Sequence, residues 1–156
     1  MEINFGPRGI LEINDARIIH RNFEGRGDKY NREGDRNFAV IIPNHEIADK
    51  LIEAGWNVKI KPPRNDDEEP FMFLPVKIKF NGRGPQVYLR TGSKLNRLDE
   101  ESVGILDQVD IRSVDLDIRP YEWNVNGKNG ITAYLQAIEV IQEIDRFAAR
   151  DEESEF

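Results

Sequence analysis

Short runs in which apolar and polar residues alternate recur along the chain, and Gly, Pro and Asn residues separate them. The clearest run covers residues 71–80, where every second position is apolar: Met72, Leu74, Val76, Ile78 and Phe80. Strict alternation is typical of a β-strand with one buried face, because successive side chains point to opposite sides. The same signals predict further strands at residues 9–20, 37–42, 56–61, 86–91, 111–125 and 131–142.

One segment instead has the spacing of an amphipathic helix, and it begins after Asn44. Asn44 is a favourable N-cap, and Gly55 is a natural stop for the helix. The apolar stripe between them consists of Ile47, Ala48, Leu51 and Ile52. A second short helix is expected at residues 99–106, where three acidic residues suit the positive N-terminal end of a helix.

The expected strand at residues 111–125 changes phase at Pro120, since apolar residues occupy even positions before it and odd positions after it. A bulge or sharp bend near Pro120 would explain this change. A hairpin loop at residues 126–130 then leads into the last strand. Six or seven strands with a bent long strand and a terminal hairpin predict a small closed β-barrel. A parallel α/β fold is disfavoured, because helices do not alternate with the strands.

The alternation also determines what the outer face of this barrel carries. If the apolar residues at 56–61, 71–80 and 86–91 point inward, the outward positions hold cations and rings: Lys59, Lys61, Phe71, Phe73, Lys77, Lys79, Tyr88 and Arg90. Rings stack on unpaired bases and cations follow phosphates, so such a face suits single-stranded nucleic acid. Trp123 joins this face if the change of phase at Pro120 turns its ring outward. The alternative is a solvated face whose lysines protect strand edges from aggregation.

A polar loop at residues 21–36 is rich in glycine and arginine, and its composition predicts a mobile, solvated segment. Arg26 and Arg32 are candidates for clamping a phosphate backbone, because disordered basic segments often fold on nucleic acid. Acidic residues interleave with the arginines, so a loop that is only solvated is the alternative interpretation.

The net charge of −7 at first argues against a nucleic-acid partner. The acidic residues are unevenly distributed, however, since four lie among the last six residues and four form the block at 66–69. The rest of the chain is close to neutral, so basic faces can exist despite the acidic total.

The chain ends in an acidic run that closes on an aromatic residue, and we expect it to be disordered. Its ring and free carboxylate could dock together into a basic-rimmed pocket of a partner protein, or its acids could compete with DNA for the cationic face. The residues concerned are Asp151, Glu152, Glu153, Glu155 and Phe156.

Catalytic and metal-binding patterns are weak. The chain has no cysteine, and its two histidines, His20 and His45, lack metal-ligand spacing. A metal-dependent nuclease using Asp115, Asp117 and Glu139 is an alternative, although surface acids paired with neighbouring cations explain these residues more simply. No nucleophile or phosphate-loop motif is present, so we expect neither catalytic residues nor a metal or other cofactor.

Three stretches resemble the last hairpin of bacteriophage single-stranded DNA-binding proteins: residues 114–123, residues 126–130 and residues 132–137. The acidic tail ending in Phe156 is similar to the tail of phage and bacterial members. The order of elements follows the family over residues 36–142, whereas the helix at 44–55, the acidic loop at 66–69 and the early arginine-rich loop depart from the bacterial pattern. The resemblance implies an OB fold, a five-stranded Greek-key barrel, that binds single-stranded DNA without sequence preference.

The sequence therefore predicts a mainly β, OB-like domain at residues 1–144 and an acidic interaction tail at 145–156. The resemblance implies action in phage DNA replication, recombination and repair, with replication or recombination proteins recruited by the tail. The alternative is a β-barrel protein-interaction module, such as a virion or assembly component, without nucleic-acid binding. We expect a cytoplasmic protein, because the first residues lack a signal peptide and no apolar run could span a membrane. Exposed edge strands would permit a homodimer.

Overall fold

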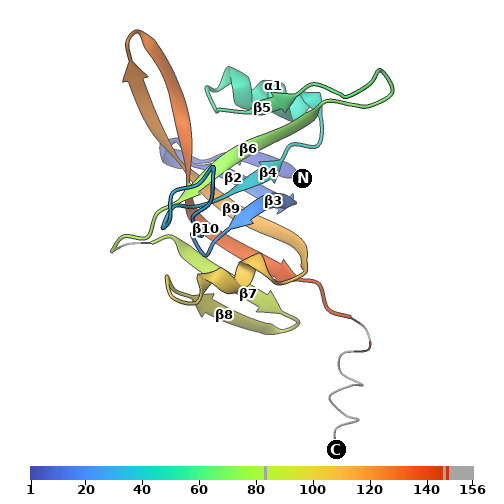
Figure 1. Ribbon diagram of the computed structural model, residues 1–156, viewed down its shortest axis with the longest axis vertical. Helices are drawn as coiled ribbons and strands as arrows, with labels where there is room; N and C mark the ends of the chain where they lie inside the picture. The colour runs from blue at the N-terminus through green and yellow to red at the C-terminus, as the bar shows by residue number, and fades with distance from the viewer. Residues whose placement is uncertain (83, 146, 148–156) are drawn as a thin grey trace, which may run out of the picture.

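The strands form one mixed sheet that curls into a barrel, shown in Figure 1 for this computed structural model. The structure describes residues 1–82, 84–145 and 147. In chain order the elements are β1 (Glu2–Phe5), η1 (Pro7–Gly9), β2 (Leu11–Ala16), β3 (Ile18–Asn22), β4 (Arg36–Ile41), α1 (His45–Glu53), β5 (Lys59–Lys61), β6 (Phe71–Ile78), β7 (Gln86–Thr91), β8 (Lys94–Leu98), η2 (Val103–Asp107), β9 (Ile111–Val125) and β10 (Lys128–Gln142). No helix among these is long and apolar enough to cross a membrane.

The strand order β1-β2-β9-β10-β6-β4-β3 explains the curvature of the sheet. Strand β2 is next to one end of this order and β3 forms the other end, yet the two are consecutive in the chain with only Arg17 between them. The first half of this bent strand pairs with β9 and the second half with β4. The sheet therefore returns to itself through a covalent bend rather than through a final hydrogen-bonded pair. This arrangement confirms the mainly β, OB-like prediction, but the sheet is open between its end strands among the described residues, so the expectation of a closed barrel was wrong.

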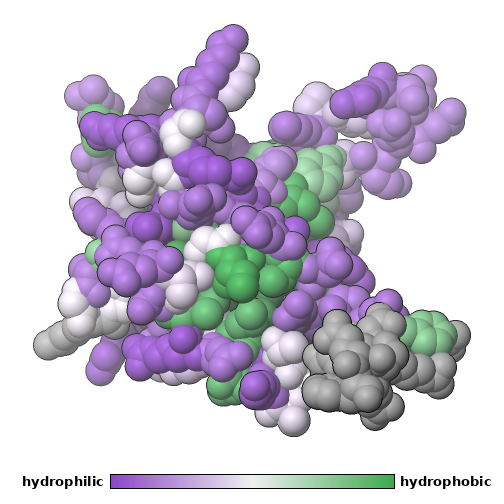
Figure 2. Space-filling model, turned by 60° about the horizontal axis from the view of Figure 1, so that its bottom comes forward, coloured by the Kyte–Doolittle hydropathy of each residue, from purple (hydrophilic) through white to green (hydrophobic). Residues whose placement is uncertain are grey.

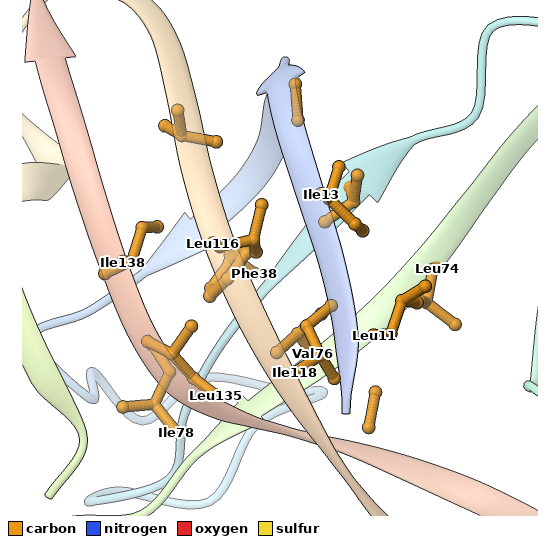
Figure 3. Close-up of a cluster of buried hydrophobic side chains, with 14 of the residues drawn as sticks. Leu11, Ile13, Phe38, Leu74, Val76, Ile78, Leu116, Ile118, Leu135 and Ile138 are labelled. Atoms are coloured by element: carbon orange, nitrogen blue, oxygen red, sulfur yellow. The ribbon is translucent and has the colours of Figure 1, made fainter. Parts of the chain in front are cut away.

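The barrel interior is apolar and is built from the inward positions of the alternating runs. Neighbouring strands place these residues directly opposite one another, as in the pairs Phe38–Val76 and Leu116–Ile138. Figure 3 shows side chains from β2, β4, β6, β9 and β10 converging in this core. Outside it the surface is mainly hydrophilic, with apolar side chains gathered near the middle of the side shown in Figure 2.

Helix α1 begins and ends as its sequence predicts. The Asn44 side chain accepts a hydrogen bond from the Ile47 backbone N–H at 2.9 Å, and Gly55 adopts a φ of 98° just beyond the helix. Ala48 and Leu51 are buried in the core, whereas Ile52 stays exposed. The segment after Gly55 continues to the base of the β9–β10 hairpin, where the Ile131 N–H donates to the Gly55 carbonyl.

Replacing Asn44 with alanine is expected to lower the free energy of unfolding by about 1 kcal/mol, because one backbone N–H of α1 loses its acceptor. Chemical denaturation measures this change. The Asn44→Asp variant is the control, since aspartate caps equally well. Equal losses in both variants would show that the cap itself contributes nothing.

Four details of the fold differ from the sequence-based expectation. The expected strand at 9–20 is two strands, β1 and β8 were not predicted, and the second helix is a short 3₁₀ turn at 103–107. The expected bulge near Pro120 is present, but in the partner strand rather than in β9, where Pro120 pairs in register with Ala133. The irregularity lies opposite, where β10 gains Gln136 as an extra residue. Beyond Pro120 the β9–β10 hairpin projects away from the barrel (Figure 1). Its apolar residues therefore do not have to point toward the barrel core.

Candidate nucleic-acid interface

Strands β5 and β6 present a cluster of rings and ammonium groups on the outside of the barrel. The register pairs Lys59 with Phe73 and Lys61 with Phe71, so all four side chains lie on one face. The Phe71 and Phe73 ring centroids are 5.6 Å apart, and the Lys61 Nζ lies 5.8 Å from the Phe73 centroid. His20 of β3 packs edge-on against Phe73 at 5.6 Å. Phe71 retains 38% of its accessible surface, which makes its ring available to a ligand.

A lateral row of polar and aromatic residues crosses the same outer face. The pairings Asn22–Asn37, Asn37–Lys77, Lys77–Tyr134 and Tyr134–Arg119 run through five strands. The Arg119 guanidinium lies 5.2 Å from the Tyr134 ring centroid, a cation–π contact. Lys77 was predicted from sequence as part of this face, whereas Tyr134 and Arg119 were not. The sequence did carry a signal for Tyr134: it lies between the core residues Ala133 and Leu135, so strand alternation turns its ring outward.

The projecting β9–β10 hairpin extends this row away from the barrel. Strand alternation from Arg119 places Tyr121 and Trp123 on the same side of β9. The Tyr121 and Tyr134 rings meet edge-on with centroids 6.0 Å apart, and Trp123 lies directly over Gly130. Trp123 keeps 37% of its accessible surface. The ring is therefore turned outward, as the sequence allowed, and stands in line with the row.

The arginine-rich loop between β3 and β4 is internally hydrogen-bonded rather than merely solvated. The Asn22 Oδ1 accepts from the backbone N–H groups of Gly25 and Arg26, and the Asp107 carboxylate accepts from those of Phe23 and Glu24. Composition alone did not predict these hydrogen bonds, because they depend on η2 and on side chains that are distant in sequence.

The loop carries exposed cations and one ring. Arg26 and Arg32 are both exposed, although Arg26 lies 3.8 Å from the Glu24 carboxylate and 3.9 Å from that of Asp107. Tyr30 retains 90% of its accessible surface, with the Lys29 Nζ 5.7 Å from its ring centroid. Sequence reasoning missed Tyr30, and the signal was a lone aromatic residue among polar neighbours.

Tyr88 and Arg90 lie apart from the β5–β6 cluster. Strand β7 pairs with β8 and with the part of β10 that follows Gln136, and Tyr88 stands between Glu139 and Arg97. The Arg90 Nε donates to Glu139 Oε1 at 2.5 Å. The Arg90 guanidinium is therefore already paired with a carboxylate. The structure therefore does not join these two residues to the other candidates.

The three candidate nuclease acids form no metal site. Asp115 and Glu139 are cross-strand partners, but Glu139 binds Arg90 and Asp115 accepts from the Asp15 backbone N–H at 2.9 Å. Among the described residues, no group of three or more histidine or acidic side chains is arranged to hold a metal ion.

Burial, together with the neighbouring Glu12, raises the pKa of the Asp117 carboxyl above its ordinary value. The folded state then binds this proton more tightly than the unfolded chain, so the ionised carboxylate costs stability above that pKa, and the cost disappears as pH falls through it. Asp117→Asn is expected to raise the melting temperature slightly at pH 7 and to leave it unchanged near about pH 3. Thermal unfolding at both values tests this, and a lower melting temperature at pH 7 would contradict it.

The tail residues from Asp151 to Phe156 lie outside the described residues, so their predicted role rests on sequence.

The fold and the outward face define an OB-like β-barrel whose surface is suited to nucleic acid. Residues 5–153 match the family model described as "Putative phage ssDNA-binding domain". The chain belongs to this family.

Solved structures of the single-stranded DNA-binding protein from bacteriophage Enc34 have the same fold. Its C-terminal truncation matches at 13% identity and a TM-score of 0.59, over 90% of both chains. The full protein matches at 12% identity and a TM-score of 0.58, over 96% of this chain and 94% of the Enc34 chain. The protein in its complex with ssDNA matches at 13% identity and a TM-score of 0.57, over 94% of this chain and 93% of the Enc34 chain. No curated protein matches the chain.

Proposed function

We propose that the protein binds single-stranded DNA without sequence preference through the outer face of β5, β6, β10 and the β9–β10 hairpin. The observation that carries this proposal is the cluster of Phe71, Phe73 and Lys61, which the barrel core does not need. Each stacked base is worth about 1–3 kcal/mol, and lysines beside the rings neutralise phosphates. Rings of this kind favour a single strand, because the bases of a duplex are already stacked on one another.

We propose that this binding serves phage DNA replication, recombination and repair; membership of a phage ssDNA-binding family supports the DNA-binding part of this role. The Enc34 protein, which shares the fold, has been solved in complex with ssDNA. Such a protein acts in the host cytoplasm, where exposed single strands arise during copying and exchange of DNA. Association of two copies through the exposed edges of the sheet is compatible with this role.

We further propose that the acidic tail recruits partner proteins and competes with DNA for the cationic face. Removing residues 151–156 deletes four carboxylates and is expected to strengthen binding to oligo(dT) severalfold at low salt. The gain should shrink at moderate salt, where counterions screen the competing charges. Fluorescence anisotropy of both forms measures the difference, and equal affinities at low salt would rule out competition.

The central experiment is a fluorescence titration with dye-labelled oligo(dT) and a matching duplex at low and moderate salt. Tight, salt-sensitive binding to the single strand with weak binding to the duplex is the expected result. Failure to bind either ligand, with the tail removed as well, would contradict the proposal. It would favour a barrel that binds proteins in a virion or assembly.

A further inference from the structure

A groove of about 470 Å³ lies between the arginine-rich loop and the outer face of β6 and β10. Its volume falls within the range of about 300–1,000 Å³ that is usual for pockets holding small ligands. The residues that give the groove its chemistry are Asn31, Asn37, Lys77, Lys79, Phe80 and Tyr134. Two of them, Lys79 and Lys77, were predicted from sequence as part of the binding face, whereas the groove itself was not.

Asn31 holds the outer wall of this groove in place. Its Nδ2 donates to the backbone carbonyls of Arg26, Arg32 and Asp35 at 2.8, 3.1 and 2.9 Å. Its Oδ1 accepts from the Asn37 Nδ2 at 2.9 Å. One side chain therefore joins both limbs of the loop to each other and to the outer face of β4, so the wall is formed before any ligand arrives.

The groove combines the three kinds of group that a nucleotide needs. Two ammonium groups can neutralise a phosphate, the Tyr134 ring can stack on a base, and the Asn37 amide can hydrogen-bond its edge. The Phe80 ring also lines the groove, with the Arg36 guanidinium 5.4 Å from its centroid. Two carboxylates, Asp35 and Glu100, also border the groove. The Arg36 guanidinium neutralises Glu100, to which its Nη1 lies 3.2 Å away.

We propose that this groove is a subsite for one nucleotide of the bound strand, and that Asn31 is the positioning residue that keeps it open. The inference rests on the proposed function and deepens it. The groove continues the face that carries the β5–β6 cluster, since Lys77 and Phe73 are four residues apart on β6, roughly 13 Å along the strand. A strand that covers the rings of Phe71 and Phe73 can therefore continue into the groove.

Photo-crosslinking locates the bound strand directly. An oligo(dT) containing 5-iododeoxyuridine is irradiated with the full-length protein, and crosslinked peptides are identified by mass spectrometry. Crosslinks at Tyr134 or Phe80 are expected. Crosslinks confined to Phe71 and Phe73 would overturn the subsite while leaving the proposed function intact. Absence of oligo(dT) binding altogether would instead overturn the proposed function.

A double-mutant cycle tests the role of Asn31. Asn31→Ala is expected to weaken oligo(dT) binding roughly tenfold, because the wall no longer holds the base over the Tyr134 ring. In a Tyr134→Ala background the same change should cost less than about twofold, since the subsite is already lost. Unchanged affinity for Asn31→Ala alone, or equal losses in both backgrounds, would overturn the positioning role.

The matched control is Asn65→Ala in the acidic loop. The Asn65 Oδ1 accepts from the Asp67 N–H at 3.1 Å, so this change removes a similar turn contact away from the groove. Its affinity for oligo(dT) should equal that of the wild type. Circular dichroism establishes that each variant is folded, and crosslinking of the wild-type protein decides the question if Asn31→Ala is not.

Discussion

Replacing both Phe71 and Phe73 with alanine is expected to weaken binding to oligo(dT) by roughly 30-fold or more, because two stacking platforms worth about 1–3 kcal/mol each are lost. The single variants should show smaller effects that do not add up, since the two rings contact each other at a centroid distance of 5.6 Å. Equilibrium anisotropy titrations of the single and double variants at one salt concentration measure these losses.

Phe5→Ala is the matched control for this experiment. Phe5 is also an exposed phenylalanine, but it lies on β1, at the other side of the strand order from β6. Its removal should leave oligo(dT) affinity unchanged. Wild-type affinity in a folded Phe71→Ala/Phe73→Ala protein would exclude the two rings from the interface.

Neutralising the four lysines of the outer face is expected to change the salt dependence of binding as well as its strength. Each lysine that contacts a phosphate contributes about 0.7 to the slope of log K against log salt for a single strand. The variant with glutamine at Lys59, Lys61, Lys77 and Lys79 should therefore show a slope about 3 units smaller. Its affinity should fall most at low salt, where counterion release contributes most. Titrations at four or more salt concentrations give the slope.

The double variant Lys59→Gln/Lys61→Gln has a matched control in Lys50→Gln/Lys94→Gln, which removes the same charge elsewhere. Lys50 lies 3.6 Å from Glu46 on α1, and Lys94 is on β8. If both pairs reduce the slope equally, the effect reflects net charge alone and the face makes no specific phosphate contacts.

The inward and outward residues of β6 could be predicted from sequence because a strand has a period of two. Once Leu74 and Val76 are assigned to the core, Phe73 and Lys77 must point outward, whatever the strand pairs with. The same local logic placed the Asn44 cap and the Gly55 stop of α1. These predictions needed no information about distant residues.

The grouping of the outward residues could not be predicted, because it depends on pairing between distant segments. Tyr88 and Arg90 alternate like Phe73 and Lys77, yet β7 meets β10 beyond the extra residue Gln136 and beside Glu139. Asn31 is one of several asparagines in polar loops, and only the folded loop shows what its amide joins. Register and loop closure thus decided which candidates share a site.

The position of β10 in the sheet has a consequence for synthesis of the protein. It is the last strand along the described chain, yet it pairs with β9 antiparallel and with both β6 and β7 in parallel. A ribosome-bound chain that ends before residue 128 lacks the strand that joins these three, so the two halves of the sheet have no common neighbour. The barrel therefore cannot be completed before β10 has been synthesised, and until then the apolar inner faces of β6 and β7 lack their shared neighbour and are prone to aggregate.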